Sequence, residues 1–112
     1  MAKLECILCG DFDTILNDLT NTIMSGSASA SIEEESDFCY GDCRQAVRAF
    51  ERYSYFGGNR VSLTIVLLKS KDTISFTAMA TGGSQAVFFK MNTVGEESFL
   101  DSIMNTVEKY KA

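Results

Sequence analysis

The chain has 112 residues, 46% hydrophobic and 22% charged, a balance typical of one globular domain with one core. It contains no histidine, which excludes Ser-His and Cys-His nucleophile arrangements and removes the commonest metal ligand. The net charge of −5, the lack of an apolar run of roughly 20 residues and the lack of a secretory signal pattern at the start predict a cytoplasmic protein that binds neither nucleic acid nor membrane.

The first two predicted elements are a strand and a helix. Lys3–Cys9 is a short apolar segment that ends at Gly10, as a strand does. Asp11 or Asp13 is placed to cap the helix that follows, and Gly26 is placed to end it in a left-handed conformation. The apolar stripe of this helix has helical spacing and comprises Phe12, Ile15, Leu16, Leu19 and Ile23.

The next segment alternates serine with alanine. We expect Ser27–Ser31 to lie in a strand, with Ala28, Ala30 and Ile32 facing a core kept narrow by the helix above. The run Glu33–Glu35 is expected to be solvated, and residues 37–42 to contain a turn around Gly41. Glu33–Asp37 lacks the alternating ligands and turn glycine of a calcium loop, which favours a solvated strand or loop over a cation site.

Cys43–Tyr55 fits either a helix or a strand. As a helix, it has Val47, Phe50 and Tyr53 on one face. As a strand, it has one apolar face that Glu51 interrupts, made of Val47, Ala49, Tyr53 and Tyr55. We favour the strand, because the hairpin signal at residues 56–59 then joins it to the strand that follows.

Two further strands show the clearest pattern in the chain. Apolar residues alternate with their neighbours between Arg60 and Leu68, at Val61, Leu63, Ile65 and Leu67. They alternate again after a polar turn at Lys69–Asp72, at Ile74, Phe76, Ala78 and Ala80. This period predicts an antiparallel hairpin with one buried face.

The last predicted elements are a short strand and a helix. Gly82–Ser84 interrupts the chain, and Ala86–Met91 is a short, strongly apolar strand. Asn92 or Thr93 is placed to cap a final helix, and Glu96 and Glu97 fall in its first turn. Its apolar stripe comprises Phe99, Leu100, Ile103, Val107 and Tyr110.

This order predicts a single α+β domain over residues 1–112. It has two layers: an antiparallel sheet of about five or six strands, and two helices that cover one sheet face with their apolar stripes. The other sheet face is expected to be exposed or paired. The order strand, helix, four or five strands, helix is similar to the repeat unit of TATA-binding-protein-like folds, which says nothing of DNA binding.

Four cysteines allow three interpretations. Cys6 and Cys9 have the two-residue spacing of a zinc knuckle, and Cys39 and Cys43 have a looser spacing. On a regular strand Cys6 and Cys9 project from opposite faces, so free thiols in a reducing cytosol are the favoured interpretation, with a disulfide as a further alternative. We therefore expect no metal and no cofactor.

Charge is unevenly distributed along the chain. Residues 1–43 hold nine acids and one lysine, whereas residues 44–90 hold seven bases and two acids. The candidate binding residues of the basic part interleave arginine with tyrosine, as interfaces do: Arg48, Arg52, Tyr53, Tyr55 and Arg60. The simpler interpretation is that these arginines pair with acids on a neighbouring strand and cover aromatic rings with their stems.

A second candidate site is the glycine turn at Gly82-Gly83-Ser84-Gln85. Successive glycines can turn backbone N–H groups inward to hold an anion, and Lys90 lies on the next predicted strand. The segment lacks the Gly-Lys-Ser/Thr ending of a phosphate-binding loop, and an ordinary hairpin turn is the simpler interpretation.

Four strings of sequence support a resemblance to a known family: residues 51–54, 57–62, 82–90 and 95–101. With them the chain resembles a bacterial family of short, stand-alone proteins known only as a domain of unknown function. The resemblance implies a small cytoplasmic bacterial protein and brings no activity, ligand or catalytic residue. It also implies no cysteines at positions 6 and 9, which weakens the zinc interpretation.

These observations predict a non-enzymatic module that binds or self-associates through the open sheet face or a strand edge. A homodimer is the simplest outcome, because an edge with unpaired N–H and C=O groups invites a second strand. The alternative is a domain that binds a small anionic or amphipathic ligand near Gly82–Gln85. An enzyme ranks third, since no feature indicates a carboxylate or thiolate in a cleft.

Overall fold

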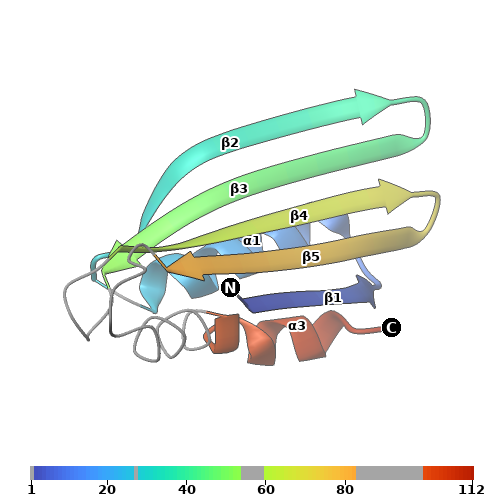
Figure 1. The fold of residues 1–112 in the computed structure, drawn as a ribbon. Helices are drawn as coiled ribbons and strands as arrows, with labels where there is room; N and C mark the ends of the chain where they lie inside the picture. Colours follow the sequence, from blue (N-terminus) through green and yellow to red (C-terminus); the bar gives the residue numbers. More distant parts are fainter. Residues whose placement is uncertain (1, 27, 54–59, 83–99) are drawn as a thin grey trace.

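The computed structural model describes residues 2–26, 28–53, 60–82 and 100–112. Within them lie five strands and two helices (Figure 1). In chain order these are β1 Ala2–Leu8, α1 Phe12–Ser25, β2 Ser31–Tyr40, β3 Cys43–Tyr53, β4 Arg60–Ser70, β5 Thr73–Gly82 and α3 Met104–Tyr110.

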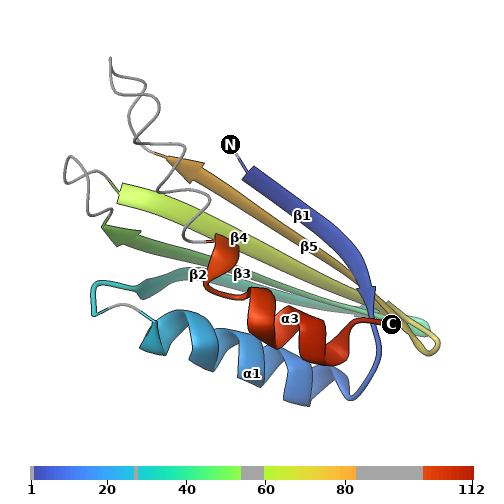
Figure 2. The same ribbon diagram turned by 90° about the horizontal axis from the view of Figure 1, so that it is seen from below.

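The five strands form one antiparallel sheet in the order β1-β5-β4-β3-β2. Both helices lie on the same side of this sheet, as Figure 2 shows. The described part of the chain therefore confirms an α+β fold with two layers and five strands. The predicted sixth strand, Ala86–Met91, lies outside the described residues, and the likeness to TATA-binding-protein-like order stays a prediction.

Helix α1 has the predicted start and the predicted buried stripe. The Asp11 carboxylate caps it by accepting a hydrogen bond from the Thr14 backbone N–H at 3.0 Å, which lowers the pKa of Asp11. The buried residues of α1 are the five predicted from helical spacing. The predicted left-handed ending is wrong: Gly26 has φ −78°, and its N–H donates to the carbonyls of Thr22 and Ile23.

The predicted strand of alternating serine and alanine is also wrong. Residues 28 and 29 form a turn, and β2 begins only at Ser31. Ala28 and Ile32 are both exposed, so neither faces a narrow core as expected. The physical reason is that alanine and serine side chains bury too little apolar area to hold a strand against a core.

Strand β3 is confirmed as a strand, but the predicted buried face is wrong. Ala46 and Phe50 are fully buried, whereas Val47 and Ala49 lie on the opposite face and are half-buried. Pairing with β4 decides this, because Phe50 lies opposite the buried Leu63 and Ala46 opposite the buried Leu67. Opposite residues of paired strands project from the same face, so the register places Phe50 in the core.

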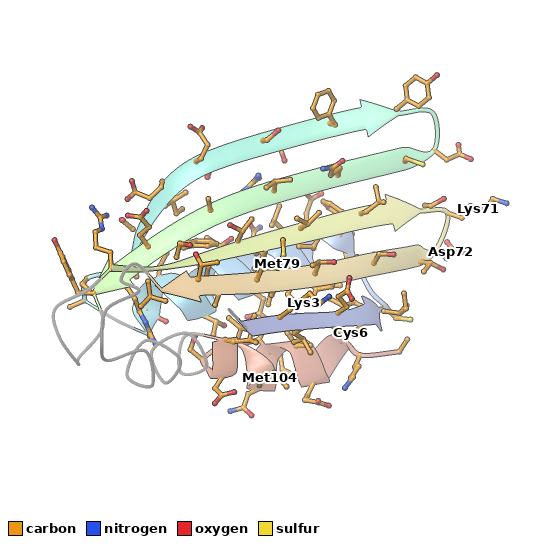
Figure 3. The ribbon with its side chains drawn as sticks, in the orientation of Figure 1. Lys3, Cys6, Lys71, Asp72, Met79 and Met104 are labelled. Atoms are coloured by element: carbon orange, nitrogen blue, oxygen red, sulfur yellow. The ribbon has the colours of Figure 1, made fainter. Side chains whose placement is uncertain are left out.

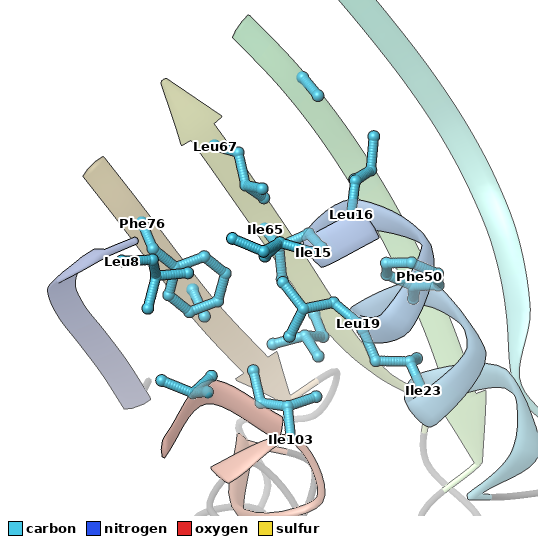
Figure 4. Packing of buried hydrophobic residues seen from close by; sticks show 14 of the residues in the cluster. Leu8, Ile15, Leu16, Leu19, Ile23, Phe50, Ile65, Leu67, Phe76 and Ile103 are labelled. Atoms are coloured by element: carbon cyan, nitrogen blue, oxygen red, sulfur yellow. The ribbon is translucent and has the colours of Figure 1, made fainter. Parts of the chain in front are cut away.

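Strands β4 and β5 have the predicted alternation. Their buried positions are those that the sequence pattern indicates, and they meet the buried stripe of α1 and Val107 of α3 in one cluster (Figure 4). The cluster also contains Leu8 of β1 and Ile103, which precedes α3. The other face of the sheet carries no described helix, and we call it the open face.

Helix α3 packs beside α1 through polar contacts as well as apolar ones. The hydroxyl groups of Thr22 and Thr106 are 2.8 Å apart. Asp18 accepts a hydrogen bond from the Tyr110 hydroxyl at 2.7 Å and forms an ion pair with Lys109 at 2.8 Å. The predicted start of this last helix, at residues 92–97, lies outside the described residues.

Candidate functional site

The two edges of the sheet differ in how their backbone groups are used. On the outer side of β1, the Ala112 N–H donates to the Ile7 carbonyl at 3.0 Å, and the Cys9 N–H donates to the Tyr110 carbonyl at 2.7 Å. The C-terminal residues thus cover one end of this edge. Among the described residues, β2 pairs only with β3, and its outer side accepts no other strand.

The β2 edge is long and exposed. Nine of its ten residues are exposed to solvent. Phe38 and Tyr40 are the two most exposed large hydrophobic side chains described, at 68% and 87%. A long strand edge next to exposed aromatic rings is a surface on which another strand readily pairs.

The open face continues the apolar character of Phe38 across the sheet. Register pairs place Phe38, Leu68 and Ile7 in one row, separated by Gln45 and Ser75. Leu68 is 41% exposed and Ile7 is 45% exposed. Figure 3 looks onto this face, where Lys3 and Met79 mark the far side of the sheet from β2. An apolar row therefore leads from the β2 edge across the open face.

Three of the four acids of β2 are paired with arginines of β3 and β4. On the helix side of the sheet, Arg48 lies 3.1 Å from Asp37 and 3.8 Å from Glu35, with its side chain only 11% exposed. Arg60 lies 3.7 Å from Glu33 and forms a second ion pair with Glu51. The interpretation that arginines neutralise the acidic strand is confirmed for these pairs.

A further arginine ties β3 to α1. Arg44 makes two hydrogen bonds to the Asp13 carboxylate, at 2.7 and 3.1 Å, and its guanidinium lies 4.3 Å from the centre of the Phe12 ring. The hydrogen bonds from Arg44 lower the pKa of Asp13 and raise the pKa of Arg44. This cluster fixes the start of α1 on the sheet.

The structure does not bring the predicted binding residues to one surface. By register, Arg48 and Arg52 lie on the helix side of β3, whereas Tyr53 and Arg60 lie on the open face. The Arg60 guanidinium lies 5.7 Å from the centre of the Tyr53 ring, a cation–π contact. Gly82 ends β5. The other candidates lie outside the described residues: Tyr55, Gly83, Ser84, Gln85 and Lys90.

The four cysteines are free thiols divided between opposite edges of the sheet. Cys6 and Cys9 lie in and just after β1, whereas Cys39 and Cys43 lie on β2 and β3. Strands β1 and β2 are four spacings apart, about 19 Å at roughly 4.8 Å per spacing, so no single ion can bind all four sulfur atoms. Among the described residues no three metal-ligating side chains gather. Burial raises the pKa of the Cys6 thiol, which makes it a poor nucleophile.

Sequence reasoning missed the residues that the structure makes most conspicuous, Phe38 and Tyr40. The available signal was the alternation of Phe38 and Tyr40 with Asp37 and Cys39 after the acidic run. That alternation predicts a strand through Tyr40, and the turn that we expected around Gly41 follows it directly, at Gly41 and Asp42. Which strand lies at the edge depends on strand order, which the alternation does not contain.

Comparison with known proteins places the chain in a family. A family model described as a family of unknown function (DUF6054) matches residues 1–111. The chain belongs to this family. No curated protein matches the chain, and no solved structure does. The family brings no activity or ligand, and bacterial and cytoplasmic origin stay predictions.

No helix in the described ranges is long and apolar enough to cross a membrane.

Proposed function

We propose that the chain is a non-enzymatic binding module that contacts a protein partner through the β2 edge and the open face beside it. The observation that carries this proposal is the pairing of β2 with β3 alone among the described strands, next to Phe38 and Tyr40. Main-chain groups on such an edge supply hydrogen bonds to an added strand, and the neighbouring side chains supply specificity.

The simpler interpretation is that the acids of β2 keep the edge from pairing at all. Charged side chains are a common protection of strand edges. Here, however, the acids lie between Glu33 and Asp37, and the last three residues of the strand are Phe38, Cys39 and Tyr40. Two exposed aromatic rings do not protect this end of the strand from pairing, so contact with a partner explains them better.

The proposal contains no catalytic step. The chain has no histidine. Among the described residues, the charged side chains with perturbed pKa values are held either in a helix cap, as Asp11 is, or in contacts between structural elements, as Asp13, Asp18, Arg44 and Lys109 are. Binding of a small ligand at Gly82–Gln85 stays a prediction, because three of those four residues lie outside the described ranges.

A photo-crosslinking residue at position 38 or 40 tests the proposal in the native host. The matched control carries the same residue at position 105 on α3, where Asn105 is exposed in the other layer. We expect one discrete adduct from positions 38 and 40 and none from position 105. The crosslinked partner is identified by mass spectrometry, and its binding to the purified chain is then measured. Adducts from all three positions, or from none, would refute the proposal.

A further inference from the structure

We infer that the β2 edge binds the β2 edge of a second copy of this chain, antiparallel, with Phe38 of each copy on the twofold axis. The inference rests on the proposed function and names its partner and register. It follows from where the carboxylates of β2 lie. Like charges directly opposite each other destabilise a strand pair, so the acids decide which self-pairings are allowed.

A twofold axis perpendicular to the sheet joins two copies of β2 into one continuous sheet with both helix layers on the same side. With the axis on a given residue, positions equally far before and after it face each other. An overlap of at least five residues on each copy of Ser31–Tyr40 requires the axis to pass through a position from 33 to 38.

Five of these six registers place carboxylates against carboxylates. An axis at residue 33, 34, 35 or 37 sets an acid against the same acid of the second chain, and an axis at Ser36 sets Glu35 against Asp37 of the second chain. The side chains of Glu35 and Asp37 stay 54% and 58% exposed even beside Arg48, so their charges remain accessible to a second strand. These five registers are disfavoured.

Only the axis at Phe38 avoids every such clash. It sets Phe38 against Phe38 of the second chain, and it sets Asp37 against Cys39 and Ser36 against Tyr40 across the two chains. On the open face, two Phe38 rings then lie between two Tyr40 rings, and aromatic cross-strand pairs are favourable. Glu33–Glu35 stay outside the overlap in water. The acids thus select one register, and the exposed aromatic rings occupy its centre.

The overlap is short, about 17 Å at roughly 3.4 Å per residue, so the dimer is reversible and forms at high protein concentration. Sedimentation equilibrium of the purified chain, with reductant present, measures it directly. We expect the average mass to rise from 12.3 kDa toward twice that value as concentration increases to the millimolar range.

Phe38→Lys is expected to weaken the dimer at least tenfold, because it places two ammonium groups at the axis. Asn105→Lys is the matched control: it adds the same charge at an exposed position of α3, in the other layer, and should leave dimerisation unchanged. The side chains of Phe38 and Asn105 are both exposed, and circular dichroism checks that each variant folds.

The register is read from a disulfide. Phe38→Cys keeps all four acids of β2 and places the two introduced thiols opposite each other on the axis, so mild oxidation should give a covalent dimer joined 38 to 38, mapped by mass spectrometry. A strict monomer at millimolar concentration, a dimer that Phe38→Lys does not weaken, or a covalent dimer joined only through other cysteines would overturn the inference. A strict monomer that still gives the in-cell adduct with a different protein would leave the proposed function standing.

Discussion

Replacement of Phe50 tests which face of β3 is buried. Phe50 is 0% exposed and shares one cluster with Leu63 and the α1 stripe, so Phe50→Ala removes a ring from a site that cannot collapse freely. Such truncations cost about 3–5 kcal/mol. With an unfolding entropy of about 2.1 cal/mol/K per residue over 112 residues, a loss of about 4 kcal/mol lowers Tm by roughly 17 °C.

Val47→Ala is the matched control on the same strand. Val47 lies on the open face and is only half-buried, so loss of two methyl groups costs about 1 kcal/mol, or roughly 4 °C in Tm. Thermal and urea unfolding of both variants measure the difference. A cost for Val47→Ala that equals or exceeds the cost for Phe50→Ala would refute the assignment of faces.

Three further predictions concern the contacts that hold the layers together and two turns. Hydrogen bonds from Lys109 and Tyr110 lower the pKa of Asp18 in the folded state, so the Asp18 carboxylate stabilises the fold above its unfolded pKa, and this stabilisation is lost as pH falls through the folded pKa. The Tm difference between wild type and Asp18→Asn should therefore vanish in acid. A Tm difference that grows in acid would contradict the contact. Thr106→Val should cost about 1 kcal/mol in urea unfolding by removing the hydroxyl pair with Thr22, whereas no loss would show that this pair is not formed. Gly41→Ala should cost about 1 kcal/mol because Gly41 has φ +57°, and Lys71→Gly, at φ +58°, should cost less or stabilise; the reverse order would contradict the two turn conformations.

The sequence was most informative where one face of an element is buried and the other is not. The stripe of α1 and the alternation in β4 and β5 each have one period and one apolar side, so their buried residues were predicted correctly. The same argument failed for β3. Both of its faces carry apolar side chains, Ala46 and Phe50 on one and Val47 and Ala49 on the other. Pairing with β4 decides between them, and that register is a property of two strands.

The candidate site was less predictable for a related reason. Arg48 was singled out for its residue type, but its ion pairs form only because Glu35 and Asp37 lie on the adjacent strand. Phe38 was passed over because exposure of a strand edge depends on the order of all five strands. Composition and spacing describe one segment at a time, whereas an edge is defined by the neighbour that a strand lacks.

Amide hydrogen exchange of the monomer, followed residue by residue at low protein concentration, tests the central claim most directly. A strand paired on one side only protects every second N–H group, whereas an interior strand protects all of them. We predict alternating fast and slow exchange along Ser31–Tyr40 of β2, and uniformly slow exchange along Cys43–Tyr53 of β3. Uniformly slow exchange along β2 would mean that its outer edge is already covered, and would contradict the account.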